Sequence, residues 1–445
     1  MSLLGAASVH AQDQNKLLEE ERRRAMDARA RNDDELGQRL LWDAGGWLHA
    51  EVVSLDDPPD EAERTLRYLD LRLWGELRLD RTYTAYLRLQ TDYVDFNSGD
   101  QFEGEDDNEI RFLYVDQAWV EADWSTEGAD FVVRAGRQFI SLGRGLLFNQ
   151  VAYGVVAEWA QGRWGAKAFG AHTIIHDDDI DQSLPNHDDS RRAFGALEVN
   201  YVLAGYHRAY AMFMFEKDLN DEDPETAAQD WEYDAQYLGA GLRGAFFRDL
   251  GYHVEAIYEM GSSVAAGTTD AEDIRAFSLT LQLEYRFQAP TSPAVLLEYL
   301  YGSGDGDRGS VTDLAAGNQP GTDDEGFLGF GFLQTGYALF PRVSNIHIFR
   351  LGGSLKPLES VEACRYLEVG AFGYLYRKAE SAAPISDPRA FVDDAEVGTE
   401  IDLFLRWRVL SDLGLSVNFG RFMPGDAYDD DDGRNFFSAG FTYGF

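Results

Sequence analysis

The sequence predicts an all-β protein, a transmembrane outer-membrane antiparallel β-barrel of about 18 strands with a short charged helix before it. Three observations predict this fold. Residues 437–445 alternate Phe, Ala, Phe, Tyr and Phe with Ser, Gly, Thr and Gly, and the chain ends on Phe445. Many earlier segments alternate in the same way, and the connections between them are alternately short and long. A strand with one face in lipid and the other in a lumen needs this period of two.

Composition agrees with a membrane barrel and excludes helical insertion. The chain has 445 residues, of which 13% are aromatic, and a mean hydropathy of −0.36. No apolar run approaches the roughly 20 residues that a spanning helix needs. The single cysteine, Cys364, rules out an intrachain disulfide framework and a cysteine-based zinc site. We expect it to be a buried or lipid-facing small residue.

The first 38 residues are predicted to lie outside the barrel. Residues 1–11 resemble the end of a secretory signal peptide, because a short apolar stretch precedes Val9-His10-Ala11, a cleavage-type sequence. The basic leading segment is missing, so we expect a truncated start. Residues 12–38 are highly charged and rich in helix formers, which predicts a periplasmic helix that serves as a partner contact or a spacer. The barrel is predicted over residues 39–445.

The strands follow from hydrophobic alternation. Residues 69–79 alternate leucines with polar residues, and after the tight turn 80–82 the pattern returns over 83–90, which is typical of a hairpin with one oily face. The resulting count is even, as in single-chain bacterial barrels. Strands are predicted near 40–53, 65–79, 82–96, 109–124, 130–141, 151–161, 163–176, 191–204, 207–218, 232–247, 251–262, 274–288, 293–302, 345–357, 365–377, 396–409, 413–422 and 434–445.

The connections predict the orientation. Short turns belong on the periplasmic side of such barrels and long loops outside, whereas a soluble sandwich has no reason to keep this asymmetry. The longest connection, 302–345, is rich in Gly and Asp and carries an apolar patch at 327–332. It folds into the lumen as a constriction or remains a surface loop; the sequence leaves both open. The predicted short turns are 80–82, 125–129, 162, 205–206, 248–250, 289–292, 358–364 and 410–412.

The formal net charge of −39 is concentrated in the long loops. A surface of this sign excludes nucleic acid as a partner. Binding of Ca²⁺ or another divalent cation at the cell surface is one interpretation, but solubility or a saline habitat is favoured, because carboxylate clusters solvate well. Residues 304–310 lack the ligand pattern of an EF-hand. The acidic runs lie at 103–109, 177–181, 218–225, 323–325 and 429–432.

Three stretches resemble the alginate-export porins of Gram-negative outer membranes. They are residues 114–120 (Tyr-Val-Asp-Gln-Ala-Trp-Val) followed by 134–138 (Arg-Ala-Gly-Arg-Gln), residues 336–340 running to 354–357, and residues 398–403 followed by 420–425. Each motif is short, and their order and spacing carry the resemblance. It implies an 18-stranded channel through which a secreted uronic-acid polymer leaves the periplasm. The strand count obtained from periodicity agrees with this.

A polyuronate carries one carboxylate per sugar, so its channel should present guanidinium and ammonium groups. Alternation places equal numbers of cations and anions on the lumen face. Such mixed charge suits either a path that binds a polyanion weakly or a ladder of ion pairs that braces the wall. The residues predicted to line the path are Arg72, Arg78, Arg88, Arg134, Arg137, Lys167, Arg192, Arg286, Arg350, Glu400, Asp402, Arg406 and Arg408.

Arg137 does not fit the simple alternation of its strand. Its position falls on the lipid phase, where an arginine costs roughly 2–4 kcal/mol at the midplane. Either a β-bulge turns it inward or the assigned register is off by one residue, so we expect the side chain in the lumen or at the membrane interface.

One departure from the family pattern leaves alternatives open. Alginate exporters are expected to gate the periplasmic mouth with a long turn, and no periplasmic turn here is long enough. A diffusion porin for sugars or small anions is therefore the second hypothesis. A structural or adhesive barrel with a closed pore is the third. Lipid, lipopolysaccharide and periplasmic export proteins are the expected partners.

The sequence does not contain the motifs that an enzymatic function would need. Residues 239–244 fit G-x-G-x-x-G but lie inside a predicted strand, where a nucleotide site needs a strand-to-helix turn. The sequence contains no G-x-S-x-G and no H-E-x-x-H. His172 and His176 lie near a predicted outer rim, where acyl-transferring barrels place catalytic groups, but a rim histidine is more often simply polar. We predict a channel and no enzyme.

Overall fold

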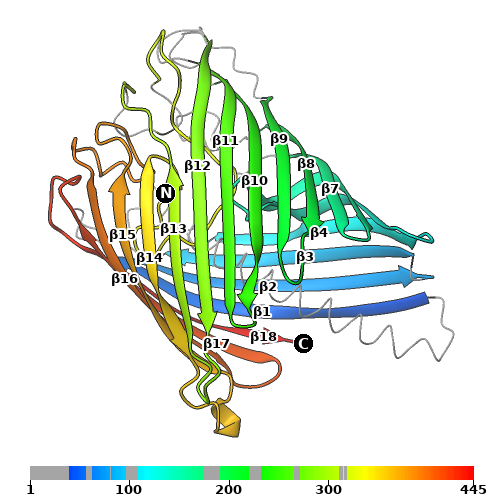
Figure 1. The fold of residues 1–445 in the computed structure, drawn as a ribbon. Coiled ribbons are helices and arrows are strands. Elements are labelled where there is room, and N and C mark those ends of the chain that lie inside the picture. Colours follow the sequence, from blue (N-terminus) through cyan, green and yellow to red (C-terminus); the bar gives the residue numbers. More distant parts are fainter. Residues whose placement is uncertain are drawn as a thin grey trace.

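The described residues form one closed antiparallel sheet of 18 strands. This computed structural model describes residues 40–56, 63–80, 82–96, 109–173, 191–219, 232–264, 271–309, 314 and 318–445. Every strand pairs with its neighbours in sequence, and β1 also pairs with β18 (Figure 1). The predicted barrel and its strand count are confirmed. The predicted signal remnant 1–11 and helix 12–38 lie outside the described residues.

The strands have the lengths that membrane-crossing β-structure needs, between 9 and 17 residues. Within the described chain, the only helical element is a short 3₁₀ turn at Glu362–Cys364. No helix of these residues is long and apolar enough to span a membrane. The strands are β1 Leu40–Asp56, β2 Glu63–Leu79, β3 Tyr83–Phe96, β4 Glu109–Ser125, β5 Asp130–Leu142, β6 Phe148–Gln161, β7 Trp164–His172, β8 Arg192–Val202, β9 Arg208–Asp218, β10 Tyr233–Phe247, β11 Leu250–Val264, β12 Ala271–Arg286, β13 Ala294–Gly302, β14 Ile346–Leu355, β15 Leu367–Lys378, β16 Glu396–Arg408, β17 Leu413–Pro424 and β18 Arg434–Gly444.

The C-terminal residue closes the barrel. The amide of Phe445 donates to the carbonyl of Gly46 at 2.9 Å, and the amide of Gly46 donates to the carbonyl of Phe445 at 2.9 Å. These reciprocal bonds continue the β1–β18 ladder to the last residue of the chain. The ladder satisfies backbone groups that would otherwise be exposed to lipid, which a spanning sheet cannot tolerate.

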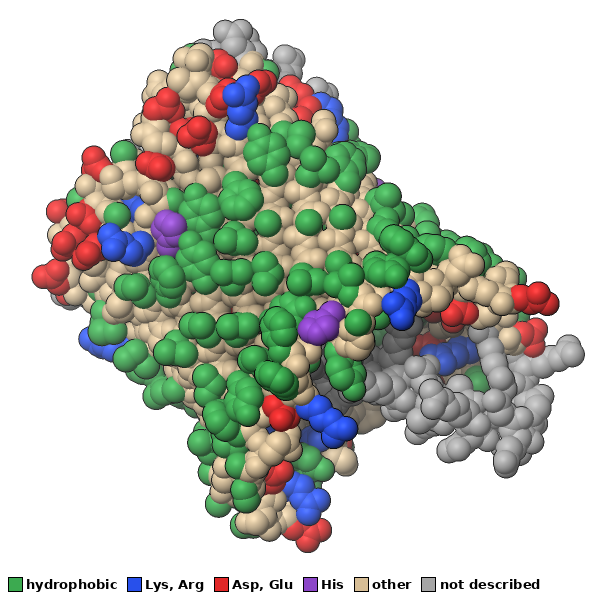
Figure 2. Space-filling model, viewed as in Figure 1, with side chains coloured by type: hydrophobic (Ala, Val, Ile, Leu, Met, Phe, Trp, Pro, Cys, Tyr) green, Lys and Arg blue, Asp and Glu red, His purple; other side chains and the backbone are tan. Residues whose placement is uncertain are grey.

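The outer face is apolar, as the alternation predicted. On β2, Leu73 and Leu77 are 41% and 46% exposed. Arg72, which faces the opposite side of the same strand, is 6% exposed. Figure 2 shows hydrophobic side chains in a broad band around the visible wall, with most charged side chains gathered beyond its two edges. Such a band suits the hydrocarbon layer of a bilayer.

The two ends of the barrel differ in their connections. One end carries the compact turns, the longest of which is 356–366, and the other carries the long loops 303–345 and 379–395. The periplasmic side is therefore the end with the compact turns. One connection at the opposite end breaks the pattern, because residues 143–147 join β5 to β6 directly. The sequence had predicted a longer outer connection there.

The glycines at 239–244 belong to a strand, as predicted. They lie in β10, and a Cβ on Gly241 would come within 2.1 Å of the Tyr210 ring on β9. A Cβ on Gly239 would lie 2.4 Å from the Met212 side chain. These glycines leave room for large inward side chains of the neighbouring strand, so the motif is a packing feature.

Candidate pore constriction

The tip of the β5–β6 hairpin bends into the lumen. Its amides reach carboxylates of distant strands: Gly143 donates to Glu198 of β8 at 3.1 Å, and Arg144 donates to Glu255 of β11 at 2.8 Å. Gly143 and Gly145 have φ values of +56° and +102°, a conformation that favours glycine. A Cβ on Gly143 would lie 2.3 Å from a Glu255 carboxylate oxygen, so only glycine allows this approach.

Arg144 carries the hairpin tip across the lumen. Its guanidinium contacts Glu298 on β13, and the same carboxylate accepts a bond from Arg350 on β14 at 3.2 Å. On the other side, Lys167 of β7 donates to the carbonyl of Ser141 at 2.7 Å. The hairpin tip therefore bonds to four strands beyond its own. Arg144 and Arg350 share the Glu298 carboxylate.

The described part of the 303–345 connection also enters the lumen. Phe330 donates its amide to the Leu147 carbonyl at 3.1 Å, and Gly331 donates to Leu146 at 2.9 Å. These bonds add a short bridge between this connection and the hairpin tip. Of the two interpretations that the sequence left open, a constriction is the correct one. We call residues 327–340 the lumen loop.

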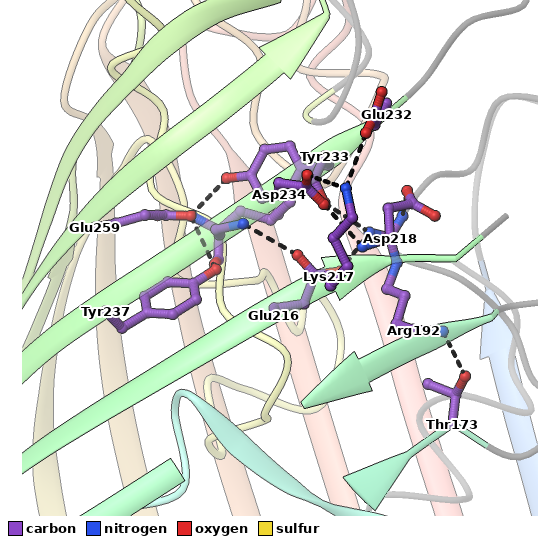
Figure 3. Close-up of polar contacts among 12 residues, drawn as sticks. Thr173, Arg192, Glu216, Lys217, Asp218, Glu232, Tyr233, Asp234, Tyr237 and Glu259 are labelled. Carbon is purple, nitrogen blue, oxygen red and sulfur yellow. Dashed lines mark hydrogen bonds and ion pairs between the residues drawn. The ribbon is translucent and has the colours of Figure 1, made fainter. Parts of the chain in front are cut away.

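Glu259 of β11 anchors the start of the lumen loop. Its carboxylate accepts bonds from the Tyr233 hydroxyl at 2.5 Å and the Leu328 amide at 2.9 Å, and the Tyr237 hydroxyl lies at 2.9 Å. Figure 3 shows Tyr233 and Tyr237 converging on Glu259 from β10. Phe327 and Phe330 are 0% and 6% exposed, so apolar burial supports the same anchor.

These two insertions divide the lumen into sectors. Inward side chains of β6 to β11 form an apolar core with the loop, including Phe148, Phe194, Met214 and Ile257. Inward side chains of β1 to β4 and β14 to β18 include many buried charged groups, together with apolar ones such as Ile348, Tyr376 and Phe422.

Three predicted path arginines are buried in ion pairs. Arg88 is 1% exposed and contacts Asp116, which also pairs with Arg72 at 3.2 Å. Arg72 pairs in turn with Asp70 at 2.8 Å. Arg192 is 2% exposed and pairs with Glu216 at 2.8 Å and Asp218 at 3.0 Å. These groups brace the wall, because a passing solute cannot reach them in this conformation.

Replacing Arg192 with alanine should destabilise the barrel. The change leaves Glu216 and Asp218 buried without their counter-charge, which typically costs about 3–5 kcal/mol. Urea unfolding in lipid vesicles measures the effect. Lys217→Ala is the matched control on the same hairpin, because its side chain is 49% exposed and its pairs with Glu232 and Asp234 are surface pairs, worth about 1 kcal/mol or less. Equal losses in both variants would contradict the bracing role.

Another group of cations lies on aromatic rings. The guanidinium of Arg350 lies 3.9 Å from the Phe372 ring centroid, that of Arg406 lies 4.9 Å from Phe404, and that of Arg408 lies 4.4 Å from Tyr366. Phe372 and Phe404 are themselves stacked at 5.8 Å. Arg406 and Arg408 are exposed, and among the described residues no carboxylate forms an ion pair with Arg406. This arginine ladder (Arg350, Arg406 and Arg408) runs from the constriction to the periplasmic end of β16.

Three further predicted cations are less buried and also pair with carboxylates. Arg78 pairs with Glu76 at 2.6 Å, Arg286 pairs with Glu284 at 2.6 Å, and Arg134 contacts Glu121. Arg134 also lies over the Trp119 ring at 4.3 Å. Their side-chain exposures range from 23% for Arg78 to 72% for Arg286.

Three of the predicted positions are not exposed on the lumen wall. Arg137 keeps the outward phase of β5: its Nε donates to the Asp116 carbonyl at 2.8 Å, and its guanidinium lies over Tyr153, which is 40% exposed on the outer face. No bulge turns it inward, so it is not part of the lumen wall. Glu400 and Asp402 face inward but are each 1% exposed behind the lumen loop.

Arg144 is the constriction residue that sequence reasoning missed. It was placed in an outer connection because strand alternation stops at Leu142. The signal that could have identified it is the tight Gly143-Arg144-Gly145 turn followed at once by the apolar residues 146–148. An exposed outer loop has no need of such a run, whereas a segment buried in the lumen does.

A family model described as alginate export matches residues 61–441 of this chain. The chain belongs to the alginate export family. The resemblance carried by the three short motifs is thus confirmed, and the protein is an outer-membrane channel of this family. No curated protein sequence matches it significantly.

Solved structures with the same fold are barrels of Pseudomonas aeruginosa. OccK11 (OpdR) is 14% identical, with 91% of this chain and 96% of that chain covered and a TM-score of 0.54. OccK5 (OpdH) is 12% identical, with 91% and 98% covered and a TM-score of 0.55. The outer membrane protein opdK is 11% identical, with 91% and 99% covered and a TM-score of 0.55. At this identity the likeness concerns the fold alone.

Membership of an export family supports the prediction of a channel rather than an enzyme. The outer face of this family member contacts membrane lipid and its lumen contacts passing solutes. Lipopolysaccharide and periplasmic export proteins remain predicted partners. Among the described residues, no group of three or more His, Cys, Asp or Glu side chains is arranged to hold a metal ion. Calcium at the acidic loops remains a prediction, since several of those runs lie outside the described residues.

An extracellular carboxyl group makes this channel's outer loop sensitive to pH. Burial, and secondly a hydrogen bond with Asp307, raise the pKa of Asp305 from 3.8 to about 7, and Arg308 opposes the shift. The folded loop therefore favours the protonated form. Its contribution to stability is present below about pH 4 and is lost as the pH rises through about 7.

We expect residues 303–309 to be better protected in mild acid than in base. Amide exchange, corrected for intrinsic rates, should be slower at about pH 5.5 than at about pH 8.5. Asp305→Asn should abolish most of this difference, because the amide does not titrate. A difference of the same size in Asp305→Asn would assign the effect to another group.

Proposed function

We propose that this channel passes an anionic polysaccharide, an alginate-like polyuronate, outward across the outer membrane. The arginine ladder is the observation that carries the proposal. An aromatic ring holds the Arg406 guanidinium in place without neutralising it, whereas Arg350 also pairs with Glu298. Exposed guanidinium groups can bind each uronate carboxylate in a bidentate manner and release it to the next.

The arrangement of the ladder suits a polymer that enters from the periplasm. Arg408 lies at the end of β16, Arg406 lies two residues further into the barrel, and Arg350 lies beside the constriction. Successive carboxylates of one chain can occupy successive sites. Weak binding at several sites favours passage over trapping.

Diffusion of small sugars or anions is the second candidate. The occupied constriction favours it, because the hairpin tip and the lumen loop reduce the open cross-section if both stay in place. A purely structural or adhesive barrel would show no conductance at all, so current measurement separates that third class from the first two.

Single-channel current in planar bilayers tests the proposal. The reversal potential in a KCl gradient gives the ion preference, and polyuronate oligomers are then added on the periplasmic side. We expect anion preference and current block by uronates but not by neutral oligosaccharides of equal length. A cation-preferring pore that is indifferent to uronates would overturn polymer export. Anion preference without block would favour the small-solute porin.

A further inference from the structure

Arg137 is a charged side chain on the lipid-facing side of the barrel. Its Nε donates to the Asp116 carbonyl at 2.8 Å, and its Nη1 donates to the Tyr153 hydroxyl at 3.4 Å. Among the described residues, no carboxylate forms an ion pair with this half-buried guanidinium. A charge on this face is costly in hydrocarbon, so an anionic partner would stabilise it.

The position of Arg137 along β5 places it in the outer half of the apolar band. Six residues separate it from Phe131, which stacks on Trp124 at 5.5 Å near the periplasmic end of the strand. With the rise and tilt of spanning strands, this separation corresponds to a height of about 15 Å. The apolar band of such barrels is about 25 Å tall, so Arg137 lies nearer to its outer edge than to its periplasmic edge.

The sheet opens on the extracellular side of this arginine. Within the described chain, β4 pairs with β5 only over residues 118–125, and the last pair joins residue 118 to Arg137. Beyond Arg137 the hairpin tip turns into the lumen, so the outer part of β4 pairs with β3 alone. Phe112 and Leu113 there are 84% and 59% exposed, although consecutive residues of a strand face opposite sides. We call this opening between β4 and β5 the notch. Through it a polar headgroup can reach Arg137 from outside the cell.

A shallow groove leads from Arg137 toward the periplasmic end of the wall. It crosses the outer face of β1 to β5, is mostly apolar and has a volume of about 610 Å³. One end is lined by Ala118, the ladder partner of Arg137, and by Ala135, two residues before Arg137 on the same face. Trp42, which is 78% exposed, lines the other end. Gly75 also lines the groove, and a Cβ there would meet no atom within 4 Å, so the groove is open above it.

The groove and the arginine match the two parts of a lipid molecule. An acyl chain suits an apolar groove of this size, and a phosphate suits a guanidinium that has no carboxylate partner. The charged end lies toward the cell exterior and the apolar end toward the periplasm, which is the orientation of a lipid in the outer leaflet. Tyr153 and the exposed His172, whose rings stack at 5.4 Å beside Arg137, add polar groups at the level of the headgroup.

We propose that Arg137, the notch and the groove bind one molecule of lipopolysaccharide, the phosphorylated lipid expected in the outer leaflet of a Gram-negative outer membrane. A lipid phosphate binds Arg137, and an acyl chain lies in the groove toward Trp42. The bound phosphate supplies the counter-charge that Arg137 lacks on the lipid-facing side. The inference goes beyond the proposed function and does not depend on which solute the lumen carries.

Binding of fluorescently labelled lipopolysaccharide to the full chain in phosphatidylcholine nanodiscs tests the site. Arg137→Gln removes the charge but keeps an amide that can donate to the Asp116 carbonyl, and it should weaken binding about tenfold. Arg421→Gln is the matched control, because Arg421 is exposed on the outer face, donates to Asn435 at 2.8 Å and does not line the groove. It should bind lipopolysaccharide as the wild type does.

A second variant fills the groove without changing the arginine. Gly75→Leu adds a side chain where the structure leaves open space, and it should weaken binding about fivefold. Gly170→Leu on β7 is its control, since a Cβ on Gly170 also meets no atom within 4 Å but Gly170 does not line the groove. Heat-modifiable migration on gels checks the folding of every variant. If Arg137→Gln does not fold, wild-type affinity in Gly75→Leu is enough to overturn the proposal.

The remaining outcomes identify what binds. Equal affinities in the wild type and in Arg137→Gln would overturn the proposal, and equal losses in Arg137→Gln and Arg421→Gln would mean that any outward arginine attracts the lipid. Competition with phosphatidylglycerol distinguishes the two sources of a lipid phosphate. We expect phosphatidylglycerol to displace lipopolysaccharide only weakly. Displacement at equal concentration would assign the groove to a phospholipid and overturn the choice of lipopolysaccharide.

Discussion

Reversing the charge of Arg406 and Arg408 together, to glutamate, should remove most of the channel's anion preference. The double change alters the local charge by about four units at the periplasmic end of the path, where field lines are focused by the barrel wall. We expect the chloride-to-potassium permeability ratio to fall about fivefold or more. Block by uronate oligomers should be lost with it. The reversal potential in a KCl gradient and the oligomer titration measure the two effects.

The control for this prediction is Arg421→Glu on β17. Arg421 is exposed on the outer face, and its guanidinium donates to Asn435 at 2.8 Å. This single reversal changes the charge by about two units on the neighbouring strand, but not in the lumen. We expect wild-type selectivity in this variant. Equal shifts in both would mean that overall charge, and not the arginine ladder, sets the ion preference.

Replacing Arg144 with alanine should widen the constriction. The guanidinium spans from the hairpin tip to Glu298 on β13, and its loss removes the largest side chain of the tip and one of its distant ties. We expect the open-state conductance to rise about 1.5-fold or more. Glu298 would keep only Arg350 as a partner, so the ion preference should also move toward cations.

Arg163→Ala is the corresponding control, because Arg163 lies in the compact β6–β7 turn and donates to the Leu203 carbonyl at 3.1 Å. Its removal deletes the same side chain at the periplasmic surface and should leave conductance unchanged. A folded Arg144→Ala barrel with unchanged or lower conductance would show that the hairpin tip does not limit the current.

The predicted path residues show what hydrophobic alternation can predict and what it cannot. The inward phase of Arg72, Arg350 and Arg406 follows from the period of two alone, because side chains on a strand must alternate between faces. The ion-pair partners of these arginines do not follow from the period of two. Asp116 lies on a neighbouring strand beyond a register shift near Arg88, so its pairing with Arg72 and Arg88 depends on register. Whether an inward arginine is buried or exposed was therefore beyond the sequence.

The constriction was the least predictable part. Leu146, Leu147 and Phe148 are 0–3% exposed, but an apolar run of this length fits a strand, a loop or a buried tip equally well. Its course into the lumen depends on Glu198, Glu255 and Glu298, which are 55, 111 and 154 residues away in sequence from their partners in the tip. The same holds for the lumen loop, whose attachment to Glu400 joins residues 61–63 positions apart.

The sequence by itself determined the barrel, its 18 strands, its lipid-facing side and its orientation. These features are local: they depend on alternation within a strand and on the length of each connection, and lipid requires both along the whole chain. Tertiary structure alone decided which arginines are available to a solute and what fills the lumen. Those outcomes depend on contacts between strands far apart in sequence, where the competing energies of ion pairing, ring stacking and apolar burial are settled only once the sheet has closed.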